Sequence, residues 1–301
     1  MSIPDPIAVC VATYQRPSQL RTLLDALSKQ EDAGPFRVYV VDNDPAGTGE
    51  QAATDSNIDV EYLREPEPGI VAARNAGLAG STEPLVAFID DDEYPDARWL
   101  RTLRDCLARS GADAVWGPVV SVFPPETPAW VHQGGFFSRS RYATGTIFDQ
   151  AATNNVLVRR ASIDKLAHPW FDESFSESGG SDSHLFHRIH NAGGSIVWCD
   201  EAIVYEDVPL SRMSLPWLRQ RARRTGNVRG RLLVEDGRRS RAWIEGVARI
   251  VAGSAKLMFD RVRRNPLNSS SLNTWMRGWG VLDAARGHVV VEYRRPQGDK
   301  S

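Results

Sequence analysis

The sequence predicts an α/β fold with a mostly parallel central sheet flanked by helices, followed by a basic helical extension at the C-terminus. Over the first ~110 residues, short uncharged segments rich in Val and Ile alternate with amphipathic helical patterns, which is typical of a parallel sheet covered on both faces. After Pro209 the pattern changes to long Arg-rich helices. With 301 residues, 42% of them hydrophobic, the chain can form one large domain and a smaller appendage.

The first half of the chain contains the clearest elements. Ile7–Thr13 predicts a buried strand because it is β-branched and uncharged and shows no alternation. Pro17 begins a helix that runs to about Gln30 and carries leucines on one face. The further expected strands are Phe36–Val41, Ile58–Leu63 and Leu85–Ile89, and the further expected helices are Pro68–Ala79 and Pro95–Arg109.

The second half is less regular. Between Ala114 and Arg159, strand-like segments alternate with loops rich in Pro and Gly. We expect a domain of residues 1–210 and a helical extension of residues 211–301, because the basic helical patterns begin beyond Pro209. The remaining expected elements are a helix at Gly180–Ala192, strands at Ser195–Cys199 and Ile203–Tyr205, and helices at Leu215–Leu233, Ala242–Val262 and Leu272–Arg286.

Cysteine usage and hydropathy narrow the location of the protein. Cys10, Cys106 and Cys199 are far apart and odd in number, which favours buried reduced thiols in a cytosol over a disulfide framework. We find no basic and apolar signal segment at the N-terminus, and no run near the ~18–20 apolar residues of a membrane span. The sequence therefore predicts a cytoplasmic protein, soluble or peripheral on the inner face of the cell membrane.

The net charge of -2 hides a basic block. Residues 212–264 contain 15 Lys or Arg against 4 Asp or Glu, so this block carries +11 and the remainder carries -13. Such a block indicates an anionic surface or substrate nearby. Nucleic-acid binding is not favoured, because aromatic stacking motifs are missing.

An apolar row lies within the basic block. Its members recur at helical spacing and are Trp243, Val247, Val251, Ala255 and Met258. The row either packs in a core or belongs to an amphipathic helix that lies on an anionic membrane. The pattern alone leaves both roles open.

Three aspartates, Asp90, Asp91 and Asp92, follow the strand expected at Leu85–Ile89. Clustered carboxylates repel one another, and a hard cation that bridges them to a diphosphate would offset that repulsion. In open α/β sheets, ligands bind at the carboxyl ends of the strands, where these residues lie. The alternative is an acidic, solvated turn, and the triplet alone does not decide between the two.

Polar residues also follow the first two expected strands. Thr13, Tyr14 and Arg16 stand where a dinucleotide-binding domain would carry GxGxxG. An aromatic ring and a guanidinium suit a base and a phosphate or ribose, and an ordinary strand-to-helix loop is the alternative. Asp42 and Asp44 follow the second strand, where they either accept hydrogen bonds from a base or ribose or close an Asx-turn.

Together these strand exits resemble those of the family 2 glycosyltransferases, which have the GT-A fold. The order ATYxRP, DND and DDD is similar to the family's order, and Gly69–Asn75 is similar to its G-x-x-x-A-R-N helix start before the metal-binding strand. The resemblance extends over roughly residues 5–230. Within the family the chain looks most like bacterial exopolysaccharide transferases of the succinoglycan type.

The resemblance implies binding roles for these residues. Those implied to bind the nucleotide are Thr13, Tyr14, Arg16, Asp42, Asp44, Arg74, Asp90 and Asp91. Asp90 would lie nearer the ribose and Asp92 nearer a divalent metal ion, Mn²⁺ or Mg²⁺, and both are implied metal ligands. Asn154 and Asn155 occupy the segment that contacts the donor sugar and the acceptor.

The resemblance also implies a catalytic base at the start of a late helix. Asp182 aligns with the base of the family's G-E-D-x-D-L segment, whereas Ser181 replaces its Glu and His184 its second Asp. Without the resemblance, helix capping is the favoured role for Asp182. Glu206 or Asp207, with His184 as a weaker alternative, would supply a third metal ligand.

The implied reaction is a metal-dependent, inverting transfer of a sugar. The donor would be a UDP- or GDP-linked sugar, and the acceptor a hydroxyl of a glycan or of a polyprenyl-diphosphate-linked glycolipid in surface or exopolysaccharide synthesis. Asp182 would take the acceptor proton, and the metal would neutralise charge on the departing nucleoside diphosphate. Two alternatives stay open: a nucleotidyltransferase that makes an activated sugar, and a non-catalytic nucleotide-sugar-binding protein.

Overall fold

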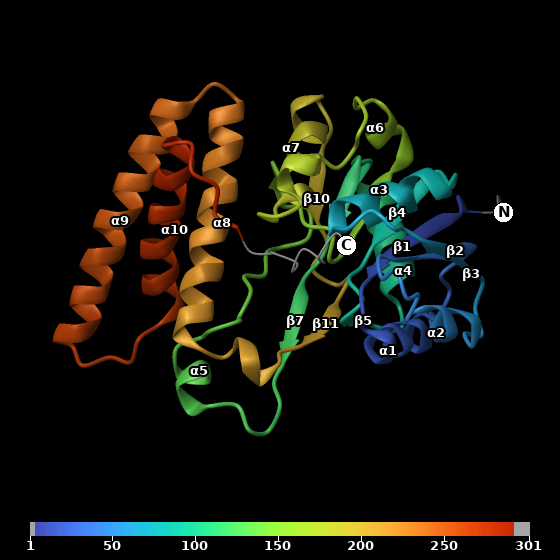
Figure 1. Cartoon of the computed structure of the whole chain (residues 1–301), viewed down its shortest axis with the longest axis horizontal. Helices are drawn as coiled ribbons and strands as arrows, with labels where there is room; N and C mark the ends of the chain where they lie inside the picture. The colour runs from blue at the N-terminus through green and yellow to red at the C-terminus, as the bar shows by residue number, and fades with distance from the viewer. Residues whose placement is uncertain (1–3, 292–301) are drawn as a thin grey trace, which may run out of the picture. The chain divides into compact units, whose positions relative to one another are not determined.

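The computed structural model describes residues 4–291, which form two compact units (Figure 1). The first unit consists of the chain up to Val122, Arg139–Glu173 and Ser181–Asp207. The second unit consists of Phe123–Ser138, Ser174–Gly180 and the chain from Val208 onward. The two domains expected on either side of residue 210 stay a prediction, and residues 292–301 of the expected extension lie outside the described residues.

The centre of the first unit is an eight-stranded, mostly parallel sheet. From one edge to the other, its strands are β3 (Val60–Arg64), β2 (Phe36–Asp42), β1 (Ile7–Thr13), β4 (Leu85–Phe88), β9 (Val156–Arg159), β6 (Ala114–Trp116), β10 (Ile196–Trp198) and β8 (Ile147–Phe148). The first four are mutually parallel, as are β6 and β10, whereas β9 and β8 are antiparallel to their neighbours. The predicted α/β fold class is therefore confirmed.

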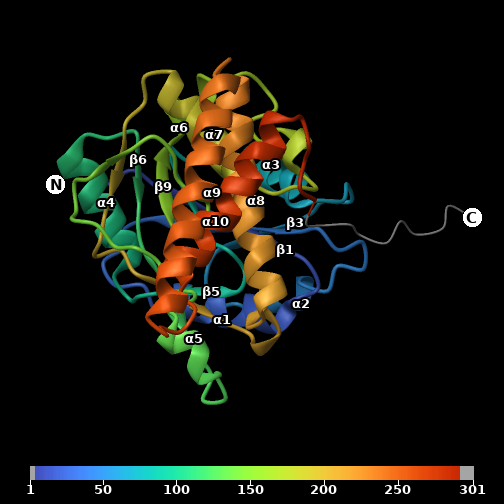
Figure 2. The same cartoon turned by 90° about the vertical axis from the view of Figure 1, so that its left-hand side faces the viewer.

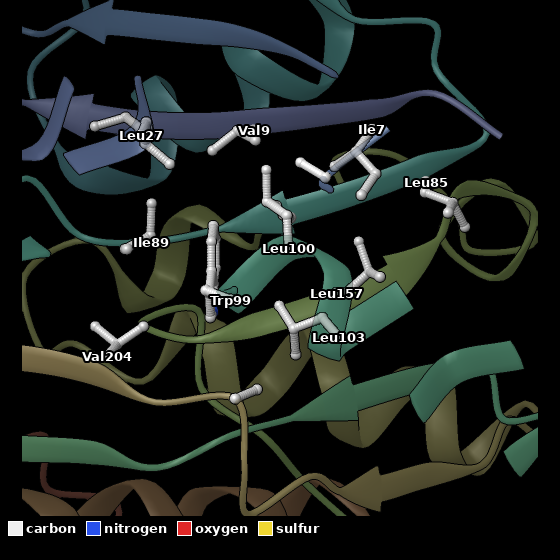
Figure 3. Packing of buried hydrophobic residues seen from close by; sticks show 14 of the residues in the cluster. Ile7, Val9, Leu27, Leu85, Ile89, Trp99, Leu100, Leu103, Leu157 and Val204 are labelled. Atoms are coloured by element: carbon white, nitrogen blue, oxygen red, sulfur yellow. The ribbon is translucent and has the colours of Figure 1, made fainter. Parts of the chain in front are cut away.

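Helices cover both faces of this sheet because β1 sends alternate side chains to opposite sides. Ile7 and Val9 share a buried cluster with α1 (Pro17–Leu27) and α4 (Trp99–Ser110), which Figure 3 shows around Trp99. Ala8 and Cys10 share the other cluster with α3 (Ile70–Gly80) and α7 (Ser181–Asn191). The short helices of this unit are α2 (Glu50–Thr54) and α6 (Arg160–Asp164).

A second sheet of three short strands completes the first unit. In it, β11 (Val204–Asp207) lies between β5 (Glu93–Pro95), its antiparallel neighbour, and β7 (Val119–Val122), its parallel neighbour. The sequence patterns did not predict β5, which follows the acidic triplet directly. For this reason α4 begins at Trp99 and not at the expected Pro95.

The second unit is built around three long helices. These are α8 (Leu215–Glu235), α9 (Arg239–Val262) and α10 (Ser269–Ala285), and their ends lie within three residues of the expected ones. The helix α10 packs against both α8 and α9 (Figure 1). The short helices are α5 (Ala129–Gln133) and η2 (Leu210–Arg212), and η1 (Glu173–Phe175) begins on the last residue of a first-unit segment. None of the described helices is both long and apolar enough to cross a membrane.

Glycines let α10 approach its two neighbours closely. A Cβ atom on Gly280 would lie 1.8 Å from the carbonyl oxygen of Arg223 in α8. A Cβ atom on Gly253 of α9 would lie 2.5 Å from the backbone of Trp275. Because close-packed atoms cannot approach to such distances, any larger side chain at these two positions would push the helices apart.

Candidate active site

The ends of two neighbouring strands bring the acidic triplet against the exit of β1. The strands β1 and β4 are adjacent and parallel, and the hydroxyl of Thr13 donates a 2.8 Å hydrogen bond to Asp91. The Nη1 atom of Arg16 lies 2.9 Å from an oxygen of Asp91 and 3.0 Å from an oxygen of Asp92. The triplet is therefore tied to the loop after β1 and is not a freely solvated turn.

The loop between β1 and α1 is tight. Its Gln15 has a φ of 55°, in the left-handed region that a non-glycine residue adopts only at a cost in free energy. The ring of Tyr14 is 37% exposed beside this turn. An exposed aromatic ring next to the guanidinium of Arg16 has the chemistry expected for binding a base and a phosphate.

Arg74 on α3 joins the triplet to the start of α7. Its Nη2 lies 3.3 Å from Asp90 Oδ1, and its Nη1 donates to the hydroxyl of Ser181 over 3.4 Å. Asp182 follows Ser181 in the first turn of α7. We call these four residues, Arg74, Asp90, Ser181 and Asp182, the Arg74 cluster.

Negative charge accumulates within the Arg74 cluster. Partial burial of Asp90, whose side chain is 41% exposed, raises its pKa to about 6, and the charges of Asp182 and of the other two aspartates of the triplet act in the same direction, whereas Arg74 lowers it. Arg74 contacts both Asp90 and Ser181, the residue before Asp182, so the predicted base lies near the predicted metal and nucleotide ligand. Such a concentration of carboxylates is the arrangement that a bound cation stabilises.

Asp182 also has a local contact in its own helix. Its Oδ1 accepts a 2.7 Å hydrogen bond from the backbone N–H of Ser183. This bond joins neighbouring residues and is not the N-cap bond that the sequence left as an alternative, since an N-cap accepts from the second or third residue of the helix. Because a carboxylate has about four acceptor positions, the bond leaves Asp182 able to accept a proton.

Asp42 and Asp44 lie beside Thr13 but form bonds within their own loop. Asp42 pairs with Thr13 in the register of β1 and β2. Its carboxylate accepts hydrogen bonds from the backbone of Asp44 (2.9 Å) and Gly49 (2.7 Å) and from the hydroxyl of Tyr62 (2.9 Å). The bond from Asp44 closes an Asx-turn, and Asp42 is 0% exposed. A direct contact between Asp42 and a base therefore requires this loop to open.

Asn155 holds backbone segments together. Its Nδ2 donates to the carbonyl oxygens of Pro118 (2.8 Å) and Ala202 (2.7 Å). Its Oδ1 accepts a 2.7 Å bond from the indole N–H of Trp99. The substrate contact predicted for Asn155 would break these bonds, so the geometry supports a structural role for this side chain.

The two residues before Asn155 present polar atoms that are not satisfied. Within residues 4–291, Thr153 Oγ1 and Asn154 Oδ1 are buried and have no hydrogen-bond partner. Thr153 lines a small cavity of about 10 Å³ together with Arg74 and Asp90. An unsatisfied buried polar atom costs free energy, and a cavity of this size has room for at most about one water molecule. A substrate hydroxyl would therefore reach these two atoms only after this segment moves.

Glu206 forms an ion pair with a basic side chain. Arg139 Nη2 contacts Glu206 Oε2, and Glu206 lies opposite Glu93 in the register of β11 and β5. In the part of the chain that the structure describes, no group of three or more His, Cys, Asp and Glu side chains could hold a metal ion. Among the described residues, Asp90, Asp92 and Glu206 are therefore not assembled as a three-ligand group, and Glu206 is paired with Arg139.

Asp90 and Asp92 by themselves suit a divalent cation. Their side chains are 41% and 22% exposed, and carboxylate oxygens are donors that Mg²⁺ and Mn²⁺ prefer. Mg²⁺ is commonly held by one or two carboxylates together with substrate phosphates, so a full cage of protein ligands is not required. A cation at Asp92 would compete with Arg16 for this carboxylate.

Residues 8–166 match the family model described as Glycosyl transferase family 2. The chain belongs to this family. It is 38% identical over 298 residues to "Succinoglycan biosynthesis protein ExoM" of Rhizobium meliloti (strain 1021), which covers 95% of this chain and 94% of that protein. It is 28% identical over 202 residues to "Glycosyltransferase AglE" of Haloferax volcanii, with 65% of each chain covered. The crystal structure of TarS from S. aureus aligns with a TM-score of 0.49 and 18% identity, covering 72% of this chain and 39% of that chain.

Family membership confirms the resemblance read from the three strand exits. The chain is a glycosyltransferase with the GT-A fold, as predicted. Membership of this family favours sugar transfer over the two alternatives, which were nucleotidyl transfer and nucleotide-sugar binding without catalysis.

Two features near the site have no clear signal in the sequence. The ion pair between Arg139 and Glu206 joins residues 67 positions apart, and no motif surrounds Arg139. Thr153 directly precedes the predicted Asn154 and Asn155, but only its burial singles it out. Both features depend on how distant segments pack, which local patterns do not record.

Proposed function

We propose that this glycosyltransferase moves a sugar, with inversion at the anomeric carbon, from a UDP- or GDP-linked donor to a hydroxyl of a glycan or polyprenyl-diphosphate-linked acceptor in surface or exopolysaccharide synthesis. The family and the 38% identity to a protein of succinoglycan biosynthesis support this substrate class. The observation that carries the proposal is the Arg74 cluster, because one guanidinium contacts both Asp90 and the residue before Asp182.

On the donor side, the loop after β1 supplies the groups for the nucleotide. The ring of Tyr14 offers a stacking surface to the base, and Arg16 offers a positive charge to the diphosphate. Asp90 and Asp92 would hold a divalent cation, which offsets the charge that develops on the departing nucleoside diphosphate. Arg16 is paired with Asp91 and Asp92 in the structure, so it reduces their mutual repulsion.

On the acceptor side, Asp182 takes the proton from the attacking hydroxyl. Arg74 bonds to Ser181 and so keeps the first turn of α7 beside Asp90. The unsatisfied oxygens of Thr153 and Asn154 are the atoms that we assign to sugar hydroxyls. Each would gain the hydrogen bond that it lacks, which favours a substrate that carries hydroxyl groups at those points.

The substitution Asp182→Asn tests the assignment of the base. An amide does not accept the proton, so we expect the turnover number to fall about 10²–10⁴-fold. The amide oxygen still accepts the bond from Ser183, and we expect donor affinity to change by less than about twofold. Release of nucleoside diphosphate measures turnover, and calorimetric titration of the donor with Mn²⁺ measures binding.

Asp164→Asn is the matched control, since it makes the same change at the exposed end of α6. Turnover of this variant should equal that of the wild type. Near-normal turnover of Asp182→Asn would remove Asp182 from the chemistry. Parallel loss of turnover and donor affinity would mean that Asp182 shapes the donor pocket and does not act as the base.

The same proposal places the reaction in the cytoplasm, with the acceptor at the inner face of the cell membrane. Cys10, Cys106 and Cys199 are free and buried, which fits a reducing compartment. Cell fractionation tests this location, and recovery of the protein outside the cytoplasm and inner membrane fractions would contradict it.

A further inference from the structure

The outer face of α9 is apolar along most of its length. The exposed apolar side chains on it, which we call the α9 stripe, are Ile244, Val247, Val251, Met258 and Val262, with 71, 49, 64, 69 and 74% exposure. Successive members are three, four, seven and four positions apart, which keeps them on one side of a helix. Single exposed apolar residues are ordinary, but a continuous row of them marks an interaction surface.

Small residues on the opposite face of α9 let it pack closely on α10. Ala242, Gly246 and Gly253 are buried. Cβ atoms on the two glycines would lie 2.6 Å from the side chain of Leu282 and 2.5 Å from the backbone of Trp275. At these two glycines the face has no room for a larger side chain, and Ile250 lies against Gly278 of α10.

The five residues of the stripe are exposed on the other side of the helix. The stripe shares Val247, Val251 and Met258 with the apolar row of the sequence analysis, and these three side chains are exposed. Core packing, one of the two roles left open for the row, is therefore wrong for these three.

The exposed charged residues at the two ends of the stripe are positive. Basic residues precede and follow it: Arg239, Arg241, Arg261 and Arg263. The two acidic residues of α9 are engaged within the bundle, because Glu245 pairs with Arg249 at 2.9 Å and Asp260 accepts a 2.6 Å bond from Ser271. The apolar stripe is thus framed by charge of a single sign.

We propose that α9 docks the enzyme on the surface of an anionic lipid bilayer. The stripe would lie at the boundary between headgroups and acyl chains, and the flanking basic residues would contact lipid phosphates. Amphipathic helices bind in this way, since apolar burial adds affinity and positive charge selects anionic lipid. The helix α9 has 24 residues, and each adds about 1.5 Å to its length. It lies along the side of the bundle that Figure 2 presents.

A second copy of the chain fits the stripe less well than a membrane does. A twofold dimer brings the same patch of two subunits together. Both ends of the stripe carry exposed arginines, so arginines would face arginines whether the two helices ran parallel or antiparallel. That repulsion disfavours the dimer, whereas an anionic bilayer attracts the same residues.

Flotation of the full chain with vesicles tests the proposal, independently of any catalytic assignment. The wild type should float with vesicles of phosphatidylglycerol and phosphatidylcholine, and much less with phosphatidylcholine alone. The triple variant Ile244→Glu, Val251→Glu and Val262→Glu should bind the anionic vesicles at least about tenfold more weakly. The matched control is Ile147→Glu, because Ile147 is 73% exposed on β8, outside the stripe, and this variant should float like the wild type.

A charge variant supplies a second, independent arm. Arg241→Gln with Arg261→Gln and Arg263→Gln keeps the stripe and removes three of its flanking charges. It should bind anionic vesicles at least about tenfold more weakly, because basic residues near the surface are attracted to anionic lipid. Circular dichroism melting of both variants checks that α9 remains folded.

Three results would overturn the proposal. The first is a wild type that stays unbound in the presence of anionic vesicles. The second is a folded triple variant, or a charge variant, that floats as the wild type does. The third is a wild-type dimer in sedimentation that the triple variant dissociates, which would assign the stripe to a second copy of the chain.

Discussion

Thr13 and Asp91 are joined by a 2.8 Å hydrogen bond between the ends of two adjacent parallel strands. The side chain of Asp91 is 7% exposed, compared with 41% for Asp90 and 22% for Asp92. Thr13 therefore holds the middle aspartate inside the protein, while the outer two remain more open. This division explains how three consecutive carboxylates can combine a structural role with a ligand-binding one.

Removing the hydroxyl of Thr13 should destabilise the fold. Thr13→Val keeps the branched shape and leaves Asp91 with one donor fewer, so we expect a loss of about 1–3 kcal/mol in the free energy of unfolding. Urea unfolding measures it. Thr54→Val is the control, because Thr54 is exposed and bonds only along its own helix, and its effect should stay within about 0.5 kcal/mol. Equal losses of unfolding free energy in both variants would mean that the hydrogen bond from Thr13 to Asp91 stabilises the fold no more than an exposed hydroxyl does.

Metal binding should depend on Asp92 and not on Glu206. Mn²⁺ together with UDP or GDP should raise the melting temperature of the wild type, since a ligand at 100 times its Kd stabilises by about 2.7 kcal/mol. Asp92→Asn should abolish the metal-dependent part of this shift. Glu206→Gln should retain it, because the Glu206 carboxylate is already paired with Arg139.

The metal experiment compares shifts with and without Mn²⁺ within each variant. Glu206→Gln leaves Arg139 without this ion pair, so its melting temperature alone is not informative. A shift that survives in Asp92→Asn would exclude Asp92 as a ligand. Loss of the Mn²⁺-dependent melting shift in Glu206→Gln would show that Glu206 is a metal ligand.

The stability of the first unit should depend on pH through Asp113. Its carboxylate accepts hydrogen bonds from the hydroxyl of Ser162 (2.6 Å) and the backbone of Ser195 (2.9 Å). Burial by itself would raise the pKa of Asp113, but these bonds outweigh it and hold the pKa below its usual value. A carboxyl group with a lowered pKa in the folded state stabilises at pH above its unfolded pKa, and this contribution is lost as the pH falls below about 4.

Asp113→Asn should consequently cost about 1–2 kcal/mol near neutral pH and less at about pH 3. Urea unfolding at both pH values measures the difference. Asp164→Asn, on the exposed end of α6, should show no such pH dependence. An equal cost of Asp113→Asn at both pH values would contradict the lowered pKa.

Local patterns predicted most of the first unit and the three long helices. The uncharged run of β1 and the leucines of α1 carry their signal in neighbouring residues, and Cys10, Cys106 and Cys199 are buried free thiols, as predicted. The strands β5 and β7 differ, because they pair with β11, which lies far along the chain. Their short segments contain too few residues to show a period, so the second sheet could not be predicted.

The candidate site was predictable to the extent that strand ends determine it. The position of the triplet after β4 placed Asp90, Asp91 and Asp92 beside Thr13. Partner choice by long side chains was not predictable, as the pairing of Arg139 with Glu206 shows. Asp42 illustrates a third case, since one local pattern suited both a base contact and an Asx-turn and only the structure reveals the turn.

Periodicity predicted an apolar face on α9 but not the direction in which it points. That direction follows from glycines, which carry no hydrophobic signal and yet decide which side of a helix can meet another backbone. The apolar row of Trp243, Val247, Val251, Ala255 and Met258 was therefore interpretable as core or as surface. The close approach of α9 to α10 at Gly246 and Gly253 resolves the question.

Because of the glycine contacts between α9 and α10, one face of α9 attaches it to the bundle and the other carries the exposed α9 stripe. Gly246 and Gly253 bring α9 close to α10, and the α9 stripe is exposed on the opposite face of the helix. The α9 stripe could thus be substituted to bind a resin, a fusion partner or a different lipid while the contact between α9 and α10 stays intact. Selection acting on this protein has the same freedom, so the two sides of one helix can change at independent rates.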